Sequence, residues 1–420
     1  MKQDLAIYLG KAIFSLTRLL KIGGGSAAPG LYALKVDPNL VEKLVSKIPK
    51  NIIITGTNGK TTTARMLAHF AKTSNFRVIR NHTGSNLERG IASALIHQSS
   101  IINRKSVDLG IWELDEAAFN ILAPKIRPNI IVFLNVFRDQ LDRYGEVDTV
   151  VKKWGETLSK LNPQTKILVN GDDANTLKIG ESFKNVQRFG VENYKISGES
   201  KTKQKYSKKL DFEAKNVKLA GLSGSTFQIL GLKIKLPIPG VYHIYDFLAA
   251  FAISQNLGLD QKKMISALSS FSPAFGRVEK LPFGYILLIK NPVGATQVLK
   301  TIAPQFKKGD RLLLALNDNL ADGTDVSWIW DADFESLQST AGNLQIICSG
   351  TRAYDLAVRL KYAGIDPELI TIVEDPKIAF KRARTGLSGQ LFILPTYTAL
   401  LHLQSVLAKM GIIKRYWEKS

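Results

Sequence analysis

The stretch Thr55-Gly56-Thr57-Asn58-Gly59-Lys60-Thr61-Thr62 decides the fold of this 420-residue chain. It follows the apolar run Ile52-Ile53-Ile54 and precedes a helical pattern that starts at Thr61 or Thr62, which gives the order strand, loop, helix. Glycines let backbone N–H groups approach phosphates, Lys60 neutralises negative charge, and a threonine hydroxyl can bind Mg²⁺. The usual pattern has a further glycine where Ile54 stands, so this loop is a variant. We predict that ATP and Mg²⁺ are bound by Gly56, Thr57, Asn58, Gly59, Lys60, Thr61 and Thr62.

Apolar runs of strand length recur on both sides of a more polar middle section. They cover residues 109–112 and 130–134, and later 285–289, 311–316, 344–347, 369–373 and 391–394. Helical segments separate them, which predicts parallel sheets covered on both faces. The polar section at 170–240 reads as an insertion or as outlying strands, and an alanine-rich helix is expected at 245–257.

This pattern predicts an α/β protein with a central ATP-binding domain, which has a parallel sheet, and a C-terminal Rossmann-like α/β domain. The expected limits are 1–48 for an N-terminal helical and loop segment, 49–275 for the central domain and 276–420 for the last one. A loop with the sequence Pro273-Ala274-Phe275-Gly276-Arg277 marks the second boundary.

The next expected strand along the chain ends in acidic residues. Its last residues read Trp112-Glu113-Leu114-Asp115-Glu116. Because ligands of parallel sheets sit at the carboxyl ends of the strands, Glu113 is best placed to hold Mg²⁺ together with Thr61. The alternative is that these acids are solvated loop residues. The polar segment 135–145 follows the next strand and points toward the same crevice.

The formal charge of +21 favours anionic partners, but charge alone does not choose between nucleotides, phosphorylated lipids, a membrane surface and nucleic acid. A lysine-rich segment at about 195–217 has only Tyr206 as an aromatic, so we read it as a solvated insertion and expect no nucleic-acid partner. Cys348 is the only cysteine, which excludes internal disulfides and fits a reducing, cytoplasmic setting. The five histidines show no metal-binding spacing.

The N-terminus is apolar enough to raise the question of a membrane anchor. Lys11 and Arg18 interrupt the stretch 5–20 at helical intervals, so it is not an unbroken span of the roughly 20 residues that crossing a bilayer needs. We predict an amphipathic helix. It either packs on the protein or touches a membrane surface.

Several motifs together resemble the Mur ligase superfamily. Beside the phosphate loop and Glu113, they are Asp142-Arg143-Tyr144-Gly145, Asn170-Gly171-Asp172-Asp173 and Phe275-Gly276-Arg277. The resemblance implies that ATP bound in the central domain phosphorylates a carboxylate and that an amine then attacks the acyl phosphate. It also implies nucleotide contacts from Asp173, His243 and Arg277, with Lys60 and Glu113 as catalytic residues.

More specific motifs are similar to the MurT family, the ligase subunits of lipid II isoglutaminyl synthases. They lie in the segments 81–90, 137–140, 290–294, 317–331 and 394–400. The resemblance implies ATP-dependent amidation of the D-glutamate α-carboxyl in the lipid II stem peptide, at the inner face of the membrane. It also implies a GatD-like glutaminase partner that supplies ammonia. Cys348 lacks the surroundings of a glutaminase nucleophile, which agrees with hydrolysis on another chain.

Subunits of this family lend an aspartate to the partner's Cys–His pair, and we assign this role to Asp325, with Asp322 and Asp331 as rivals. Nearby, Trp328 and Trp330 are either packing residues or interface anchors. Many family members carry a four-cysteine zinc ribbon, which this chain lacks, so zinc is not expected. Two alternatives remain open: a ligase that adds an amino acid to a nucleotide-linked peptide or folate, and a nucleotide-gated protein that binds nucleic acid.

Overall fold

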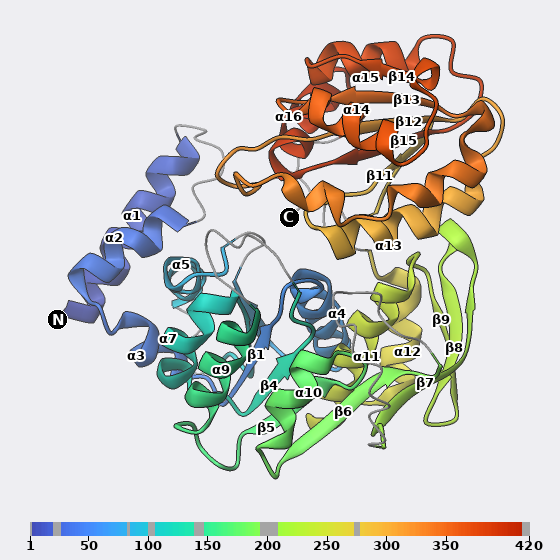
Figure 1. Ribbon diagram of the computed structural model, residues 1–420. Helices are drawn as coiled ribbons and strands as arrows, with labels where there is room; N and C mark the ends of the chain where they lie inside the picture. Colours follow the sequence, from blue (N-terminus) through green and yellow to red (C-terminus); the bar gives the residue numbers. More distant parts are fainter. Residues whose placement is uncertain are drawn as a thin grey trace.

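Two sheets with covering helices organise the protein in a computed structural model, which describes residues 2–19, 27–81, 85–99, 106–137, 147–193, 209–272 and 278–413. Figure 1 shows the larger sheet in the lower part of the view and the smaller one above it. The larger sheet has nine strands in the order β2-β3-β1-β4-β5-β6-β7-β8-β9, and the smaller has six in the order β10-β11-β15-β12-β13-β14. The predicted α/β fold with two sheets is confirmed.

The nine-stranded sheet is parallel from β2 to β7 and antiparallel from β7 to β9. Its strands are β1 (Lys50–Thr55), β2 (Val78–Arg80), β3 (Leu109–Leu114), β4 (Ile130–Phe133), β5 (Lys166–Asn170), β6 (Val186–Val191), β7 (Phe212–Leu219), β8 (Ser225–Ile229) and β9 (Leu232–Leu236). The polar middle section therefore contains outlying strands. The latter part of the predicted lysine-rich insertion, from Phe212, lies in β7, and residues 194–208 lie outside the described part.

Helices cover both faces of this sheet, as the continuous apolar strands predict. One face packs against α4 (Lys60–Thr73), α11 (Val241–Asn256) and α12 (Gln261–Ala267). The other packs against α3 (Leu40–Val45), α5 (Glu88–His97), α7 (Glu116–Ile126), α9 (Val147–Leu158) and α10 (Ala174–Glu181). Along β1, Ile52 and Ile54 belong to the first core and Ile53 to the second. This alternation holds the end of β1, and the loop that follows it, between two packed layers.

The six-stranded sheet repeats the arrangement in the last third of the chain. Its strands are β10 (Glu279–Leu281), β11 (Gly284–Ile286), β12 (Arg311–Ala315), β13 (Gln345–Ser349), β14 (Ile370–Ile372) and β15 (Leu391–Pro395), of which only β10 is antiparallel to its neighbour. One face packs against α13 (Pro292–Ile302) and α14 (Ala353–Tyr362), the other against α15 (Pro376–Arg384) and α16 (Tyr397–Lys409). All five predicted strands are present as β11 to β15.

Short 3₁₀ helices complete the connections. They are η2 (Gly221–Ser223), η3 (Leu268–Ser270), η4 (Ala303–Gln305), η5 (Ser327–Trp330), η6 (Phe334–Asn343) and η7 (Pro367–Leu369). Residues 273–277, the predicted boundary loop, lie outside the described part of the chain. The domain limits 1–48, 49–275 and 276–420 therefore stay predictions.

The predicted N-terminal helix is α1 (Lys2–Leu19), which together with α2 (Ala28–Val36) lies at the left edge of Figure 1. One face of α1 packs on the protein through Ala6 and Ile7, and the helix contacts α2 and α5. The approach of α2 to α5 is close at Gly30, where a Cβ atom would lie 1.9 Å from the carbonyl oxygen of Arg89. No helix in the described part of the chain has the length and apolar character that a membrane span needs.

Candidate functional site

The phosphate loop connects the carboxyl end of β1 to the first turn of α4. Gly56 has φ 134° and Gly59 has φ 90°, a region of backbone conformation that favours glycine. A side chain at Gly59 would also have no room, because its Cβ atom would lie 2.2 Å from Oδ1 of Asp246. Both glycines are therefore required by the loop geometry.

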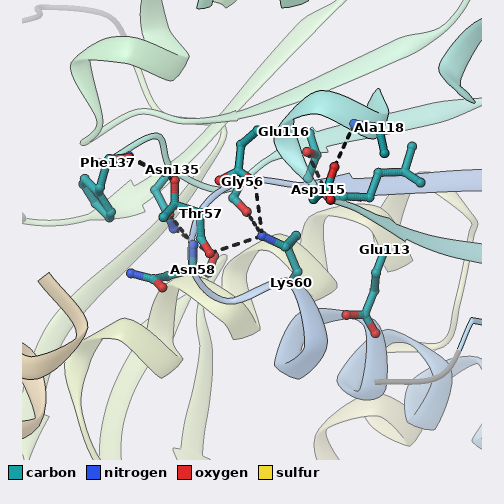
Figure 2. Close-up of polar contacts among 12 residues, drawn as sticks. Gly56, Thr57, Asn58, Lys60, Glu113, Asp115, Glu116, Ala118, Asn135 and Phe137 are labelled. Atoms are coloured by element: carbon teal, nitrogen blue, oxygen red, sulfur yellow. Dashed lines mark hydrogen bonds and ion pairs between the residues drawn. The ribbon is translucent and has the colours of Figure 1, made fainter. Parts of the chain in front are cut away.

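Asn135, just after β4, clamps the loop from the neighbouring strand (Figure 2). Its carbonyl oxygen accepts from the Thr57 N–H at 3.0 Å, and its Oδ1 accepts from the Asn58 N–H at 2.8 Å. The Asn135 side-chain amide donates back to the Asn58 carbonyl at 3.1 Å. The sequence indicates that Asn135 lies in the crevice, but it does not predict these hydrogen bonds, because its local signal is only a polar residue that follows an adjacent strand.

Lys60 is buried at the centre of the loop and begins α4. Its ammonium donates to the carbonyl oxygens of Gly56 and Thr57, and it lies 3.9 Å from a carboxylate oxygen of Glu116 (Figure 2). The N–H groups in the first turn of a helix have no acceptor within the helix, and they carry partial positive charge. The ammonium and the start of α4 together make a site for an anion.

Thr61 and Glu113 meet beside this anion site. The Thr61 hydroxyl donates to Oε2 of Glu113 at 2.7 Å, and the Glu113 carboxylate is fully buried at the end of β3. Asn81 fixes the backbone of Glu113 with two hydrogen bonds of 2.9 Å. Arg80 lies 3.9 Å from the other carboxylate oxygen.

This oxygen pair fits Mg²⁺ shared with a triphosphate, because Mg²⁺ is commonly held by one or two protein carboxylates plus phosphate oxygens and water. Within the described residues, no group of three or more His, Cys, Asp and Glu side chains could hold a metal by itself. The structure thus places the two predicted residues in contact, at the start of α4 and the end of β3, and their role as Mg²⁺ ligands stays a prediction.

His243, one of the predicted nucleotide contacts, lies on α11, which packs beside the phosphate loop. Nδ1 of His243 is 2.9 Å from Oδ2 of Asp246, and the other oxygen of Asp246 is 3.4 Å from the Thr63 hydroxyl. His243 is buried, and its Nε2 has no hydrogen-bond partner among the described residues. A buried imidazole nitrogen without a partner fits a polar group of a bound ligand. The nucleotide contact of His243 stays a prediction.

Asp173 has the contacts of a helix cap. Its Oδ1 accepts from the N–H groups of Asn175 and Thr176, at the start of α10, and its Oδ2 accepts from the Val136 N–H. Burial raises the pKa of Asp173 to about 6. These contacts give Asp173 a structural role next to the loop that follows β4, and its predicted nucleotide contact stays untested.

Residues just before α13, a helix that covers the six-stranded sheet, also contact the phosphate loop. Asn291, the N-cap of α13, exchanges two side-chain hydrogen bonds with Asn58, of 3.2 and 2.9 Å, and Nζ of Lys290 lies 3.4 Å from the Thr57 carbonyl oxygen. The motif 290–294 carries no local signal for this contact. Arg277, a predicted nucleotide contact, lies outside the described residues, as does the segment 142–145.

The three candidate aspartates of the last domain differ in their surroundings. Asp322 is buried, and its two carboxylate oxygens accept from the backbone N–H and the hydroxyl of Thr398. Asp325 and Asp331 are exposed and flank η5. Oδ1 of Asp325 accepts from the Ser327 N–H at 2.8 Å, which orients this carboxylate at the surface. Asp322 is therefore engaged within its own chain, whereas Asp325 and Asp331 are exposed, and the assignment of Asp325 stays a prediction.

Exposed aromatic side chains lie beside these two aspartates. Trp328 packs partly against the core, whereas Trp330 is 50% exposed and its ring centroid lies 5.6 Å from that of Tyr362. On α14, the exposed residues Tyr354, Val358 and Tyr362 recur every four positions and so share one face of the helix. The tryptophans therefore divide between packing and surface roles.

Cys348 lies in β13 and is fully buried in the core. Burial raises the pKa of its thiol to about 12, so the reactive thiolate is strongly disfavoured. Cys348 is therefore a small side chain of the core, and its burial agrees with the absence of nucleophile surroundings in the sequence.

Comparisons with known proteins relate the chain to two protein families and to full-length relatives. The sequence matches the Mur ligase middle domain family over residues 54–254 and the MurT ligase C-terminal family over residues 288–400. It is 30% identical to the lipid II isoglutaminyl synthase subunit MurT of Staphylococcus aureus (strain COL), over 95% of this chain and 96% of that protein. It is 31% identical to the subunit of the same name from Streptococcus pneumoniae (strain ATCC BAA-255 / R6), over 99% of each.

Solved structures show the same fold at low sequence identity. MurF from Acinetobacter baumannii superimposes with a TM-score of 0.67 at 18% identity, over 90% of this chain and 80% of that one. The folylpolyglutamate synthase of Mycobacterium tuberculosis in complex with ADP gives 0.63 at 17% identity, over 90% and 93%. With its full-length relatives, its two family matches and its Mur ligase fold, this chain belongs to the MurT family of Mur-type ligases.

Proposed function

We propose that this chain is the ligase subunit of a lipid II isoglutaminyl synthase, which uses ATP to convert the D-glutamate α-carboxyl of the stem peptide to the amide of D-isoglutamine. The observation that carries the proposal is the phosphate loop, in which Lys60 and the Thr61–Glu113 pair lie together at the ends of β1 and β3. The choice of lipid II as the substrate rests on the names of the full-length relatives.

In the first step, a carboxylate oxygen of the substrate attacks the γ-phosphorus of ATP, and ADP leaves with the electrons of the broken bond. Lys60 and the start of α4 stabilise the negative charge on the transferring group. Mg²⁺ held by Thr61 and Glu113 would neutralise further phosphate charge. Asn135 keeps the loop in one shape, so these groups need little rearrangement during the reaction.

In the second step, the nitrogen of ammonia attacks the acyl-phosphate carbon, phosphate leaves, and the nitrogen loses a proton. Water competes with ammonia for this carbon, so the site has to exclude it. The Asn58–Asn291 contact supports a role of the last domain in covering the loop, because it joins α13 directly to the phosphate-binding segment.

Ammonia in this proposal comes from a GatD-like glutaminase partner. Cys348 is buried and its thiolate is disfavoured, which argues against glutamine hydrolysis on this chain. Asp325 would orient the imidazole of the partner's Cys–His pair. The exposed Trp330 and the aromatic face of α14 support a protein contact beside it, since tryptophan and tyrosine are frequent anchors of interfaces.

The test is ATP-dependent amidation of lipid II by the purified chain, followed by mass spectrometry. Ammonium chloride alone should give the amide, and glutamine should give it only when a co-purified glutaminase is present. Conversion of acid to amide under these two conditions supports the proposal. Addition of a whole amino acid, with no product from ammonium, would instead indicate an amino-acid-adding ligase like the UDP-N-acetylmuramate--L-alanine ligase of Caldicellulosiruptor bescii, a relative at 28% identity over 82% of this chain.

A further inference from the structure

Helix α1 has two apolar faces, and only one of them is covered. Ala6 and Ile7 are buried on the covered face, which packs toward α2 and α5. The other carries Leu5, Tyr8, Leu9 and Leu16, which are 61%, 72%, 37% and 53% exposed. Tyr8, Leu9 and Leu16 follow Leu5 by three, four and eleven positions, which places all four along one side of the helix. A helix that served only to pack on the protein would carry polar residues there.

Exposed apolar side chains concentrate at this end of the chain. Among the described residues, eighteen large hydrophobic side chains are exposed, and six of them lie on α1 and the adjacent α2, which adds Leu31 and Tyr32. We call Leu5, Tyr8, Leu9, Leu16, Leu31 and Tyr32 the N-terminal apolar surface. Exposed apolar side chains gathered on neighbouring helices are typical of sites of contact with proteins or membranes.

The charge around the N-terminal apolar surface indicates which of the two it contacts. Residues 1–50 contain eight Lys and Arg but only three Asp and Glu. Lys2 and Lys11 are exposed on α1, and exposed Lys35 on α2 lies with its Nζ 5.3 Å from the centre of the Tyr32 ring. The centres of protein interfaces are depleted in lysine, whereas helices that lie on anionic membranes combine lysine with apolar and aromatic residues.

We infer that α1 and α2 dock the protein on the surface of an anionic lipid bilayer, with α1 lying in the plane of the interface. Leu5, Leu9 and Leu16 would enter the boundary between headgroups and acyl chains, and the lysines would contact anionic headgroups. The inference depends on the proposed function in one respect: docking would bring the ligase to a substrate held in the membrane. Lipid binding itself follows from the surface.

Vesicle co-sedimentation of the full chain tests the inference. The protein should bind vesicles of phosphatidylglycerol and phosphatidylcholine more tightly than vesicles of phosphatidylcholine alone, and added salt should reduce the difference. The triple variant Leu5→Gln, Leu9→Gln, Leu16→Gln leaves the charge unchanged and should weaken partitioning by about tenfold or more, because apolar area can no longer leave water. The matched control replaces three similarly exposed residues elsewhere, Ile121→Gln, Leu219→Gln and Ile378→Gln, and should bind like the native chain.

The single variant Tyr8→Ser gives a second, milder test that leaves the helix leucines in place. Thermal unfolding of each variant shows whether the fold is retained, as expected for residues that face solvent. Equal vesicle binding by the native chain and the triple variant would overturn the inference. So would equal losses in the triple variant and its control, or a triple variant that keeps vesicle binding and instead loses self-association or a glutaminase partner.

An activity measurement separates this inference from the proposed function. The triple variant should amidate a water-soluble, short-chain substrate analogue at the native rate with ammonium, but should be slower on substrate embedded in anionic vesicles. If neither protein amidates any substrate while vesicle binding still depends on α1, the proposed function fails and the docking surface stands. If both amidate embedded substrate equally, the docking surface fails and the proposed function stands.

Discussion

The phosphate-loop crevice and the Asp325 segment lie at the same kind of place, after the carboxyl ends of parallel strands, yet their side chains are held in opposite ways. In the crevice, Lys60 and Glu113 are buried, and their side chains are bonded to the phosphate loop and to α4. In the Asp325 segment, the carboxylate and the Trp330 ring face solvent. Most polar groups of the first site are buried and bonded within the chain, whereas Asp325 and Trp330 of the second site are exposed at the surface.

The difference has a physical reason. A buried polar group without a partner costs about 1–3 kcal/mol, so the fold supplies partners for most polar groups of such a crevice, and Nε2 of His243 is an exception. Asp322 shows the same rule inside the last domain, since Thr398 satisfies both of its carboxylate oxygens. An exposed carboxylate such as that of Asp325 is solvated by water and needs no partner from the fold. Its position beside the exposed Trp330 therefore favours a contact with a second chain.

The largest expected effect comes from the buried site. Lys60→Met removes the ammonium that stabilises the transferring phosphoryl group, and amidation should fall by about 10⁴-fold with ammonium and with glutamine alike. The matched control is Lys72→Met, which changes an exposed lysine near the end of the same helix and should leave the rate unchanged. The measurement is the initial rate of amide formation. A variant that loses only the glutamine-dependent reaction would contradict the assignment of Lys60.

The exposed site should behave differently. Asp325→Asn should lower glutamine-dependent amidation by about 10²- to 10³-fold, because the partner's imidazole loses the carboxylate that orients it, and should leave ammonium-dependent amidation intact. Asp331→Asn is the matched control, since Asp331 is also exposed and lies at the other end of η5. Both reactions are followed with each variant and the same glutaminase. If Asp331→Asn shows the selective loss and Asp325→Asn does not, the roles of the two residues are exchanged.

Burial changes the pKa of Asp173, a carboxylate at the edge of the crevice. Burial raises the pKa of Asp173 from 3.8 to about 6, so the folded protein keeps this proton at pH values where the unfolded chain has lost it. The stability that this group contributes is therefore present below about pH 4 and is lost as the pH rises through about 6, with a cost of about 3 kcal/mol at pH 7. Asp173→Asn keeps an oxygen for the helix cap and removes the titration.

Relative to the native chain, Asp173→Asn should gain stability as the pH rises from 4 to 7, by up to about 3 kcal/mol, on top of a constant offset from the lost Val136 contact. Urea unfolding at a series of pH values measures the difference. Asp260→Asn is the control, because Asp260 caps α12 at the surface and hydrogen bonds lower its pKa, which reverses the sign of the pH dependence. A flat difference for Asp173→Asn would contradict the raised pKa.

The parts of this structure that sequence could predict are those with a local pattern. The run Ile52-Ile53-Ile54 followed by glycines and Lys60 predicts strand, loop and helix because each step depends on neighbouring residues. Glu113 followed from the rule that parallel strands end at one edge. The clamp by Asn135 did not, because it depends on which strands become neighbours. The covered face of α1 could not be distinguished from its exposed face either, because both are apolar and only the fold determines which one packs on α2 and α5.

Burial also distinguishes residues that look alike in the sequence. Three aspartates between positions 322 and 331 have the same chemistry in the printed sequence, and only the fold distinguishes the buried Asp322 from the exposed Asp325 and Asp331. The contact between Asn58 and Asn291 joins residues 233 positions apart. No local pattern carries such a contact, although the motif that contains Asn291 could be recognised.

The smallest expected effect tests the link between the two sheets at this contact. Asn291→Ser keeps an N-cap for α13, because serine can replace asparagine there, but its side chain is too short to reach Asn58. Losing two hydrogen bonds that are partly exposed should cost about 1 kcal/mol and raise the ATP KM about fivefold, with little change in Tm. Thr301→Ala, near the far end of α13, bonds only within its own helix and is the control. A double-mutant cycle with Asn58→Ala then isolates the pair: if the two changes add fully, the asparagines do not act together, and the last domain is held over the phosphate loop by other contacts.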